Sequence, residues 1–574
     1  MKGSKESLCS PLARVLLFGA SALGLGACGT SGSGSGSASS TGSAVESSSG
    51  RADATSGGCT DGELDCPCYG NSTCNAGLVC MSDRCVPIDG ASTSDGDSGS
   101  GNETVGDTGT DDTDGEGKGE AVVLGERKAF PTAHGYARYT VGGRGGTIIP
   151  VTNTDASGPG SFREALTADG PRIIVFEVGG TIDFGSTIYI SDDNYTVLGQ
   201  TAPGDGIAVY SDEGGVESRA GEGIWRHVRF RGSNVVSNLR VIARNRGSAL
   251  TNVIVDHCSF TWPSSVPDVN EMNISFSGDE AASGDPNEIA HDFTVQASLL
   301  GESTRGSLLY RGAHSVTFYR NLWVSNNERN PIANYPDDIP HDVQQYESIN
   351  NIIHHTRGTI GLALGGKVRV SGNVWTLSSE QDPPYASGFV RGETLGQGTP
   401  SETYVHVSDN ILPKGAVETA NVDEYLHDTP YLETDLRGDL VAEAASLDSI
   451  LPHVGASPRD SVDERLVQHY LDGDGTPGVF DGTPPELSSG PVPADDNDNH
   501  IADAFEDTHG IVDATEQPEF FTIDGLTFDN REYTGGTYTR AGYEGGEPTG
   551  ERLYTWREIY WHALAGDFEG HNWE

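Results

Sequence analysis

The stretch that decides the architecture of this chain is His314-Ser-Val-Thr-Phe-Tyr-Arg-Asn-Leu-Trp-Val-Ser-Asn-Asn-Glu-Arg-Asn-Pro331. Apolar residues alternate with polar ones before Asn321, and a second apolar run begins directly after it. Alternation with a period of two predicts a strand, and an amide residue that tolerates left-handed backbone predicts a turn. The stretch therefore predicts two short strands joined by a turn at Asn321, followed by Arg329 beside Pro331.

The same pattern recurs along the chain. A small or amide residue with apolar neighbours takes the turn position in seven segments, at Asn238, Cys258, Ser298, Asn321, Asn351, Asn373 and Asn410. These positions are 20, 40, 23, 30, 22 and 37 residues apart, which indicates a bare coil of about 22 residues with loops inserted in some turns. That period predicts an all-β fold, a right-handed parallel β-helix, in which the asparagines stack as an amide ladder. A β-sandwich also has short strands, but it would not repeat an asparagine at one turn position.

Composition limits the classes of partner. The chain has 574 residues, a formal net charge of -49 and a sequence pI of about 4.4. Because the field of such a molecule repels polyanions, we expect no nucleic-acid partner. The 77 glycines, with 21% charged residues, favour many turns and short strands over long helices.

The N-terminus indicates export. Basic residues precede an apolar run at 15–25 that is too short to span a bilayer, and Leu25-Gly26-Ala27-Cys28 resembles a bacterial lipobox. This predicts a signal peptide at 1–27, lipidation of Cys28 and a Ser/Gly-rich tether at 28–58. The alternative is an ordinary signal peptide with an incidental cysteine. We expect an outer-membrane or cell-surface lipoprotein on the extracellular side, which contacts the membrane only through its lipid anchor.

A small cysteine-rich module follows the tether at 59–86. Its cysteines are Cys59, Cys66, Cys68, Cys74, Cys80 and Cys85. Six cysteines in so short an exported segment predict three disulfides with 15 possible connectivities. A zinc knuckle is the alternative, although the cluster contains no histidine. Residues 87–120 are acidic and almost without apolar side chains, which predicts a disordered linker at 87–127.

Six motifs further along the chain resemble one family. They include Val255-Asp-His-Cys-Ser-Phe260 and Asn326-Asn-Glu-Arg-Asn-Pro331, and they follow segments at 129–146, 151–166, 174–182 and 199–206. Their order is similar to that of the pectate lyase-like proteins of polysaccharide lyase family one. The resemblance assigns the β-helix to 128–476 and implies calcium as cofactor and an anionic polysaccharide, pectate or a related uronan, as substrate. We expect a monomer.

The resemblance also implies site residues. In the family an arginine matching Arg329 removes the proton α to the uronate carboxylate, and Arg305 replaces an expected lysine. The alternative for Arg329 is a salt bridge with Glu328. Three departures accompany them: Ile332 replaces an arginine, Ser248 replaces an aspartate, and Asn270-Glu271 replaces an Asp-Glu calcium pair. Glu271 and Asp268 then remain as ligands for the ion.

Two further groups of charged residues are candidates for function. The six arginines between residues 224 and 246 have no acid among them, and they are Arg226, Arg229, Arg231, Arg240, Arg244 and Arg246. Arg229 and Arg231 share a strand face, which favours a basic stripe that binds glycan together with Arg311; the alternative is a set of salt bridges. Asp256 and His257 are interpreted as a hydrogen-bonded structural pair rather than as catalytic groups.

The C-terminal extension at 477–574 contains a candidate metal loop. Its residues 495–506 match an EF-hand loop at five ligand positions, Asp495, Asn497, Asn499, Asp503 and Glu506. His500 replaces the usual glycine and needs a positive φ. A calcium loop is predicted, with a solvated acidic loop as the alternative. Before this extension, Ser457-Pro458 predicts the start of a helix, with Ser457 as its cap.

These observations predict a secreted, lipid-anchored polysaccharide lyase that cleaves pectate or a related uronan by β-elimination. The alternative is a β-helix that has lost turnover and binds anionic glycan. The departures at Ser248, Asn270 and Ile332 favour that alternative, and the ordered motifs with Arg329 favour the enzyme.

Overall fold

The computed structural model describes residues 78–81, 84–87, 127–232, 236–244, 248–263, 271–278, 290–311, 313–334, 345–356, 360–363, 366–377, 388–393, 403–431, 450–475, 484–530 and 553–568. Two compact units divide the chain, Met1–Thr113 and Asp114–Glu574. In the first unit β1 (Leu78–Met81) pairs with β2 (Arg84–Pro87) as an antiparallel hairpin. The predicted lipidation site Cys28 and the disulfides of the cysteine-rich module lie outside the described residues.

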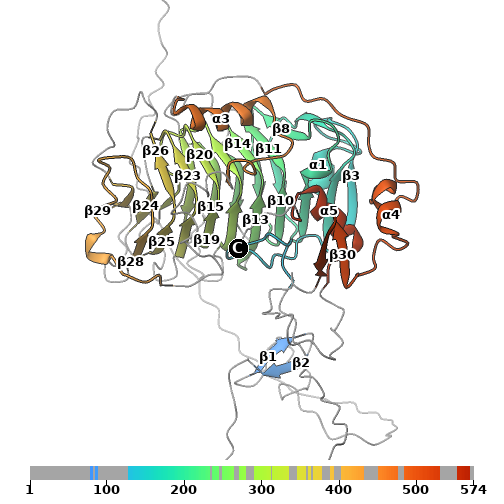
Figure 1. Ribbon diagram of the computed structural model, residues 1–574, viewed down its shortest axis with the longest axis horizontal. Coiled ribbons are helices and arrows are strands. Elements are labelled where there is room, and N and C mark those ends of the chain that lie inside the picture. Colours follow the sequence, from blue (N-terminus) through green and yellow to red (C-terminus); the bar gives the residue numbers. More distant parts are fainter. Residues whose placement is uncertain are drawn as a thin grey trace, which may run out of the picture. The chain divides into compact units, whose positions relative to one another are not determined.

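The second unit winds into three parallel sheets (Figure 1). The first sheet contains β3 (Thr147–Val151), β4 (Arg172–Phe176), β7 (Tyr195–Leu198), β10 (Gly223–Arg226), β13 (Leu250–Asp256), β16 (Ala290–Gln296), β19 (His314–Tyr319), β22 (Gln345–Ile349), β25 (Lys367–Ser371) and β28 (Tyr404–Ser408). The second contains β5 (Gly180–Asp183), β8 (Ile207–Ser211), β11 (Val228–Gly232), β14 (Ser259–Thr261), β17 (Leu299–Gly301), β20 (Leu322–Val324), β23 (Ile352–His354) and β26 (Val374–Thr376). The third contains β6 (Ile188–Ile190), β9 (Val216–Ser218), β12 (Ser237–Ile242), β15 (Met272–Ser277), β18 (Arg305–Tyr310), β21 (Ile332–Asn334), β24 (Ile360–Ala363), β27 (Val390–Glu393) and β29 (Thr419–Ala420). Each strand pairs with its equivalent in the next coil, so the predicted right-handed parallel β-helix is confirmed.

The core fills the inside of the coils. Alternate side chains of each strand point inward, and the parallel register places equivalent positions above one another. Val255 pairs with Val295, and Val295 pairs with Phe318, so one apolar row crosses three coils. The helix α1 (Phe162–Leu166) adds Phe162 to the same core near the first coil. Burial of these rows supplies most of the stabilisation of the coil stack.

An asparagine ladder runs along one turn of the coils. The side-chain oxygen of Asn351 accepts the backbone N–H of Asn321 at 2.9 Å, Asn373 does the same for Asn351 at 3.0 Å, and Asn410 for Asn373 at 2.9 Å. Side-chain amides also bond from rung to rung at 3.0 Å. The predicted ladder is confirmed at these positions. It is wrong at Asn238, which lies within β12 and donates to the carbonyl of Thr261.

The helix α3 (Ser461–Asp472) packs against the second sheet, as the orange helix across the strands in Figure 1 shows. Its Leu466 is buried with Leu299 and Leu322. Asp460 caps the helix, because its carboxylate accepts the backbone N–H groups of Val462 and Asp463. The predicted cap at Ser457 is wrong, because the cap is Asp460 and the helix begins at Ser461.

Arg229 and Arg231 lie beneath this helix, and both are fully buried. Nη2 of Arg231 lies 2.7 Å from Asp463 Oδ1 and 2.9 Å from Asp460 Oδ2. Nε of Arg229 lies 3.6 Å from Asp463 and 3.7 Å from Asp460. The interpretation of these two arginines as glycan-binding residues is therefore wrong, because a buried guanidinium needs an internal counter-charge and α3 supplies it.

The other described arginines of the same stretch also have acidic neighbours. Arg226 Nη2 lies 2.8 Å from both Asp256 and Asp567. Arg240 and Arg244 approach Glu217 at 3.5 and 3.7 Å. Salt bridges, the second interpretation of the arginine-rich stretch, therefore account for the arginines that the structure describes.

The C-terminal extension packs on the early coils. It contains α4 (Asp503–His509), β30 (Phe520–Ile523), β31 (Leu526–Asp529) and α5 (Trp556–Leu564). In α5 the carboxylate of Glu558 bonds Arg144, and Trp561 is buried with residues of β4. None of the described helices is long and apolar enough to cross a lipid bilayer.

Substitution of Asp463 tests the buried ion cluster. Asp463→Ala leaves Arg229 and Arg231 with half of their counter-charge, and loss of one partner from a buried pair costs about 3 kcal/mol or more. We expect a matching fall in the free energy of unfolding, measured by urea denaturation, whereas Glu464→Ala, an exposed acid of the same turn, changes it by less than about 1 kcal/mol. An unchanged midpoint for Asp463→Ala would contradict the cluster's role.

The same cluster sets a pH dependence. Burial alone would raise the pKa of Asp460, but Arg231, the backbone N–H of Asp463 and Arg229 outweigh it and hold that pKa below its usual value. A carboxyl whose pKa is lowered by folding stabilises the protein above its unfolded pKa, and this contribution is lost as pH falls through the folded pKa.

Candidate active site

Arg329 lies in the turn between β20 and β21, with a φ of 66°. The turn is attached to β18, because the backbone N–H of Gly306 donates to the Glu328 carbonyl at 2.9 Å and that of Ser307 to the Arg329 carbonyl at 2.8 Å. Gly306 permits this approach, since a Cβ there would meet the Arg329 oxygen at 2.6 Å. The backbone that carries the arginine is thus fixed before any substrate binds.

Three buried asparagines support the turn from below. Asn273 donates to the side-chain oxygen of Asn326 at 3.2 Å, and Asn326 donates to that of Asn330 at 3.0 Å. All three are fully buried, and the backbone N–H of Ser303 also donates to Asn326. Reasoning from sequence missed this network. Its only signal there is the pair of asparagines that precedes Glu328, which gives no indication of the partner in β15.

The structure brings the two predicted catalytic residues together. Arg305, the first residue of β18, forms a parallel bridge with Glu328 and donates from Nε to its carboxylate at 2.7 Å. Nε of Arg329 lies 3.6 Å from the same oxygen. Exposed fractions of 16% for the Arg305 side chain, 18% for Arg329 and 42% for Glu328 leave all three within reach of a ligand. The predicted salt bridge and the catalytic role are therefore compatible.

The surroundings make Arg329 less basic. Partial burial lowers its pKa most, the nearby charge of Arg305 lowers it further, and Glu328 opposes both effects. A second guanidinium beside a desolvated one disfavours the protonated form. The shift is in the direction that a proton-accepting role for Arg329 requires.

The other predicted residues of this region are not all at the same place. Arg311 follows the last residue of β18 and lies about 20 Å along the strand from Arg305, at roughly 3.3 Å per residue. Its guanidinium lies over the ring of Tyr310, 5.4 Å from the centroid. Ile332 is buried in β21 and presents no charge to the surface. Arg311 therefore lies further along the strand and is not adjacent to Arg305 and Arg329.

Of the two residues predicted to bind calcium next to Arg305 and Arg329, the structure describes only Glu271. Glu271 directly precedes β15, whose Met272 pairs with Arg305, so its position is adjacent to the arginines. Asp268 and Asn270 lie outside the described residues. Calcium takes six to eight oxygen ligands, and Glu271 by itself does not meet that requirement. The described residues beside Arg305 and Arg329 therefore do not make a complete calcium site.

The polar side chains of the loop at 495–506 form hydrogen bonds with one another and with the loop backbone at the start of α4. Both carboxylate oxygens of Asp495 accept backbone N–H groups, from Asn499 at 3.1 Å and from His500 at 2.7 Å. The side chains of Asn497 and Asn499 donate to Glu506 at 3.1 and 2.6 Å. His500 has the predicted positive φ, 64°. Carboxylate and amide oxygens are the hard donors that calcium prefers, and this loop contains both kinds.

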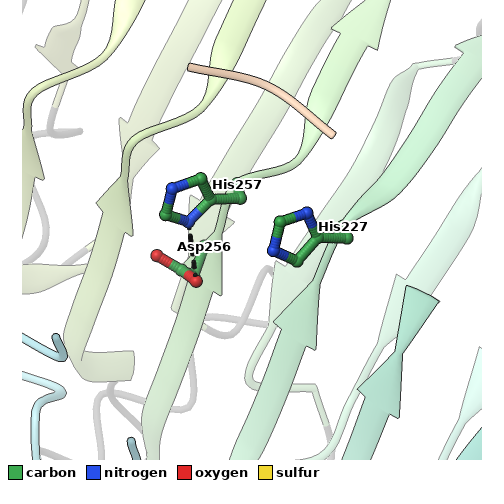
Figure 2. A group of neighbouring side chains, drawn as sticks. All are labelled: His227, Asp256 and His257. Carbon is green, nitrogen blue, oxygen red and sulfur yellow. Dashed lines mark ion pairs between the residues drawn. The ribbon is translucent and has the colours of Figure 1, made fainter. Parts of the chain in front are cut away.

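Asp256 and His257 form the hydrogen-bonded pair that the sequence predicted. Figure 2 shows Nδ1 of His257 directed at Asp256, at 2.9 Å. Arg226 and Gln296 each donate to the same carboxylate at 2.8 Å. Burial alone would raise the pKa of Asp256, but His257 and Arg226 outweigh it, so the pKa lies well below its usual range. The carboxylate stays ionised and orients the imidazole.

Comparison with known proteins places this architecture in a family. Searches find no matching family model. "Probable pectate lyase C" of Aspergillus terreus is 31% identical over 421 residues, which cover 70% of this chain and 92% of that protein. The protein of the same description in Emericella nidulans is 31% identical over 413 residues, 68% of this chain and 88% of that one.

The solved structures that match the chain have lower sequence identity. A pectate lyase bound to a hexasaccharide is 14% identical and has a TM-score of 0.43, with 59% of this chain and 100% of that one covered. Jun a 1, the major allergen from cedar pollen, is 16% identical with a TM-score of 0.38, covering 60% and 92%. The curated relatives, at 31% identity over most of their length, settle the relationship. The chain belongs to the pectate lyase family of polysaccharide lyases.

Proposed function

We propose that this chain cleaves pectate, or a related polymer of uronic acids, by β-elimination. The observation that carries the proposal is Arg329, a partly buried arginine of lowered pKa on a fixed turn, beside the second guanidinium of Arg305. Family membership supports the substrate class, because the curated relatives are named pectate lyases. An anionic polysaccharide is the partner that two adjacent cationic side chains on an open surface suit best.

The chemistry requires one base and several cations. The base removes the proton α to the uronate carboxylate, the C–H electron pair becomes a new carbon–carbon double bond, and the glycosidic oxygen leaves with its bonding pair. Negative charge grows on the carboxylate as the proton departs. Arg305 stabilises that charge, and Arg329 accepts the proton.

Substitution of Arg329 tests this assignment. We expect Arg329→Ala to lower the rate of pectate cleavage by about 10²- to 10⁴-fold, the usual contribution of a positioned acid or base. The unsaturated product absorbs ultraviolet light, which gives a direct assay. Arg311→Ala is the matched control, because it removes an arginine from the other end of β18 and leaves the catalytic pair in place; we expect it to retain most activity.

The same assay also distinguishes the enzyme from the glycan-binding alternative. The buried Ile332, at a position where an arginine is expected, favours the alternative. Equal cleavage by Arg329→Ala and the unsubstituted protein would contradict the role of Arg329. Absence of product from any uronan with the unsubstituted protein, together with pectate binding in both proteins, would replace the enzyme with the binding module.

We further propose that residues 495–506 bind calcium. The support is the match of Asp495, Asn497, Asn499, Asp503 and Glu506 to the ligand positions of an EF-hand loop, with Asn499 hydrogen-bonded to both Asp495 and Glu506. An ion that binds only the folded chain stabilises it by RT ln(1 + [Ca²⁺]/Kd). We expect calcium to raise the melting temperature and a chelator to reverse the rise.

The matched variants for this loop are Glu506→Gln and Asp507→Asn. Glu506 holds the twelfth ligand position, whereas Asp507 is the next residue and is exposed. Glu506→Gln should abolish the calcium-dependent rise, and Asp507→Asn should keep it. The same rise in both variants would place the stabilising ion elsewhere.

Lipid anchoring at Cys28 is the remaining proposal. The signal-like segment 1–27, the cysteine and the Ser/Gly tether support an anchor that holds the lyase at the cell surface. We expect labelled palmitate to be incorporated into the protein expressed in a bacterial host and to be absent from Cys28→Ser. Cys9→Ser, which removes a cysteine from the signal segment, is the control and should retain the label. Label in Cys28→Ser would contradict the proposal.

A further inference from the structure

A buried asparagine joins the turn of Arg329 to the preceding coil. Asn326 lies between β20 and β21, and its side chain is fully buried. Its amide oxygen accepts the backbone N–H of Ser303 at 3.1 Å, and its amide nitrogen donates to the carbonyl of Leu300 at 2.9 Å. These partners lie 23 and 26 residues earlier, so they belong to the coil before that of Asn326.

A rung of the asparagine ladder makes the same two bonds. The oxygen of Asn373 accepts the backbone N–H of Asn351 at 3.0 Å, and its amide nitrogen donates to the carbonyl of Ser348 at 2.8 Å. Those partners lie 22 and 25 residues earlier. Asn326 therefore has the bonding pattern of a ladder asparagine, at the corner between the second and third sheets instead of the corner between the first and second.

The third bond distinguishes Asn326 from the ladder. Asn373 donates to the side chain of Asn410, in the following coil, at 3.0 Å. Asn326 instead donates to the side-chain oxygen of Asn330, four residues further along the same turn, at 3.0 Å. Because Asn330 directly follows Arg329, this amide holds together the two ends of the turn that carries the arginine.

The oxygen of the same side chain leads to Arg305. Ser303, whose backbone N–H bonds Asn326, also bonds Arg305 through its hydroxyl group. That hydroxyl accepts the backbone N–H of Arg305 at 3.1 Å and donates to its carbonyl at 2.5 Å. One buried amide group therefore links the backbone that carries Arg305 to the residue that follows Arg329.

An asparagine suits these contacts because its short, planar amide has both an accepting oxygen and a nitrogen that donates twice. The carboxylate of an aspartate accepts but cannot donate, and an alanine makes none of the bonds. Each buried polar group left unpaired costs about 1–3 kcal/mol. The position therefore depends on the amide itself and not only on the size of the side chain.

The backbone bonds of the turn leave a specific part of the geometry to Asn326. Gly306 and Ser307 hold residues 328 and 329 to β18 through their N–H groups. Asn326 fixes the entry to the turn and its exit at Asn330. A catalytic group misplaced by about 1 Å can cost about 10²-fold in rate.

We propose that Asn326 is a positioning residue that fixes the backbones of Arg305 and Arg329 relative to each other. The catalytic consequence rests on the proposed function, whereas the link between the two backbones does not. Asn326 is buried and acts through the two arginines, without contact to the substrate.

Hydrogen exchange of the full chain, measured by mass spectrometry, tests the link without any substrate. Asn326→Ala should increase exchange in the peptides that contain residues 303–307 and 326–330, because the bonds between these segments are lost. Asn373→Ala is the matched control, since it removes the same kinds of bond two coils later, and it should leave exchange at 303–307 unchanged. Unchanged exchange at 303–307 in Asn326→Ala would overturn the proposal.

Kinetics with pectate separate positioning from stability. Both substitutions should lower the melting temperature by similar amounts, but only Asn326→Ala should lower kcat, by about 10- to 10²-fold. The value of kcat should change more than KM, because both guanidiniums remain available for binding but are no longer held in the reactive arrangement. Asn330→Ala removes only the bond inside the turn, so it should lower kcat with a smaller loss of stability, and it serves as the test variant if Asn326→Ala does not fold.

The outcomes separate this proposal from the proposed function. Equal kcat values in Asn326→Ala and Asn373→Ala, at equal loss of stability, would show a purely structural role and overturn the positioning role. No cleavage by the unsubstituted protein would contradict the proposed function instead, and hydrogen exchange at 303–307 then decides whether Asn326 links the two backbones.

Discussion

Hydrogen bonds between successive coils are the constraint on which the rest of the structure depends. Parallel pairing fixes which residues of neighbouring coils lie above one another, and a shift of one residue would turn every side chain to the opposite face. Arg305 and Glu328 are 23 residues apart and meet because β18 is in register with the turn before β21. The asparagine ladder holds that register from inside the turn, where the amide groups bond from coil to coil. The stacking of the coils therefore brings these side chains together, and the register between the strands fixes their relative positions.

Buried charge extends the same dependence to the C-terminal part of the chain. Arg231 takes its counter-charge from residues more than 220 positions later, and Arg226 takes part of its own from Asp567. A desolvated guanidinium without a carboxylate is strongly destabilising. Because these acids come from α3 and from the end of α5, both segments complete the interior of the β-helix. The arginines of this stretch that the two segments cover are therefore buried, and acidic residues from later in the same chain neutralise them.

The sequence predicts the strands and turns of the coils well, but it predicts the burial and the partners of the charged side chains poorly. The reason is physical. Alternating apolar residues and a repeated asparagine are local patterns, so the strands and the ladder could be predicted before any contact was known. Asn238 has the same local pattern within a strand, and only its partner at Thr261 distinguishes it. The charge of Arg229 and Arg231 is equally visible in the sequence, but their burial depends on a helix some 230 residues away. Motif context located Arg329, whereas the support from Asn273 through Asn326 requires the register between coils.

Glu328 determines what the open catalytic surface requires of a ligand. Its carboxylate already bonds Arg305 and lies close to Arg329, so an anionic ligand at these arginines would compete with an acceptor that belongs to the same turn. An intramolecular group has a high effective concentration, and a single sugar acid competes with it poorly. A polymer overcomes this disadvantage, because several carboxylates of one chain can engage the two guanidiniums at the same time.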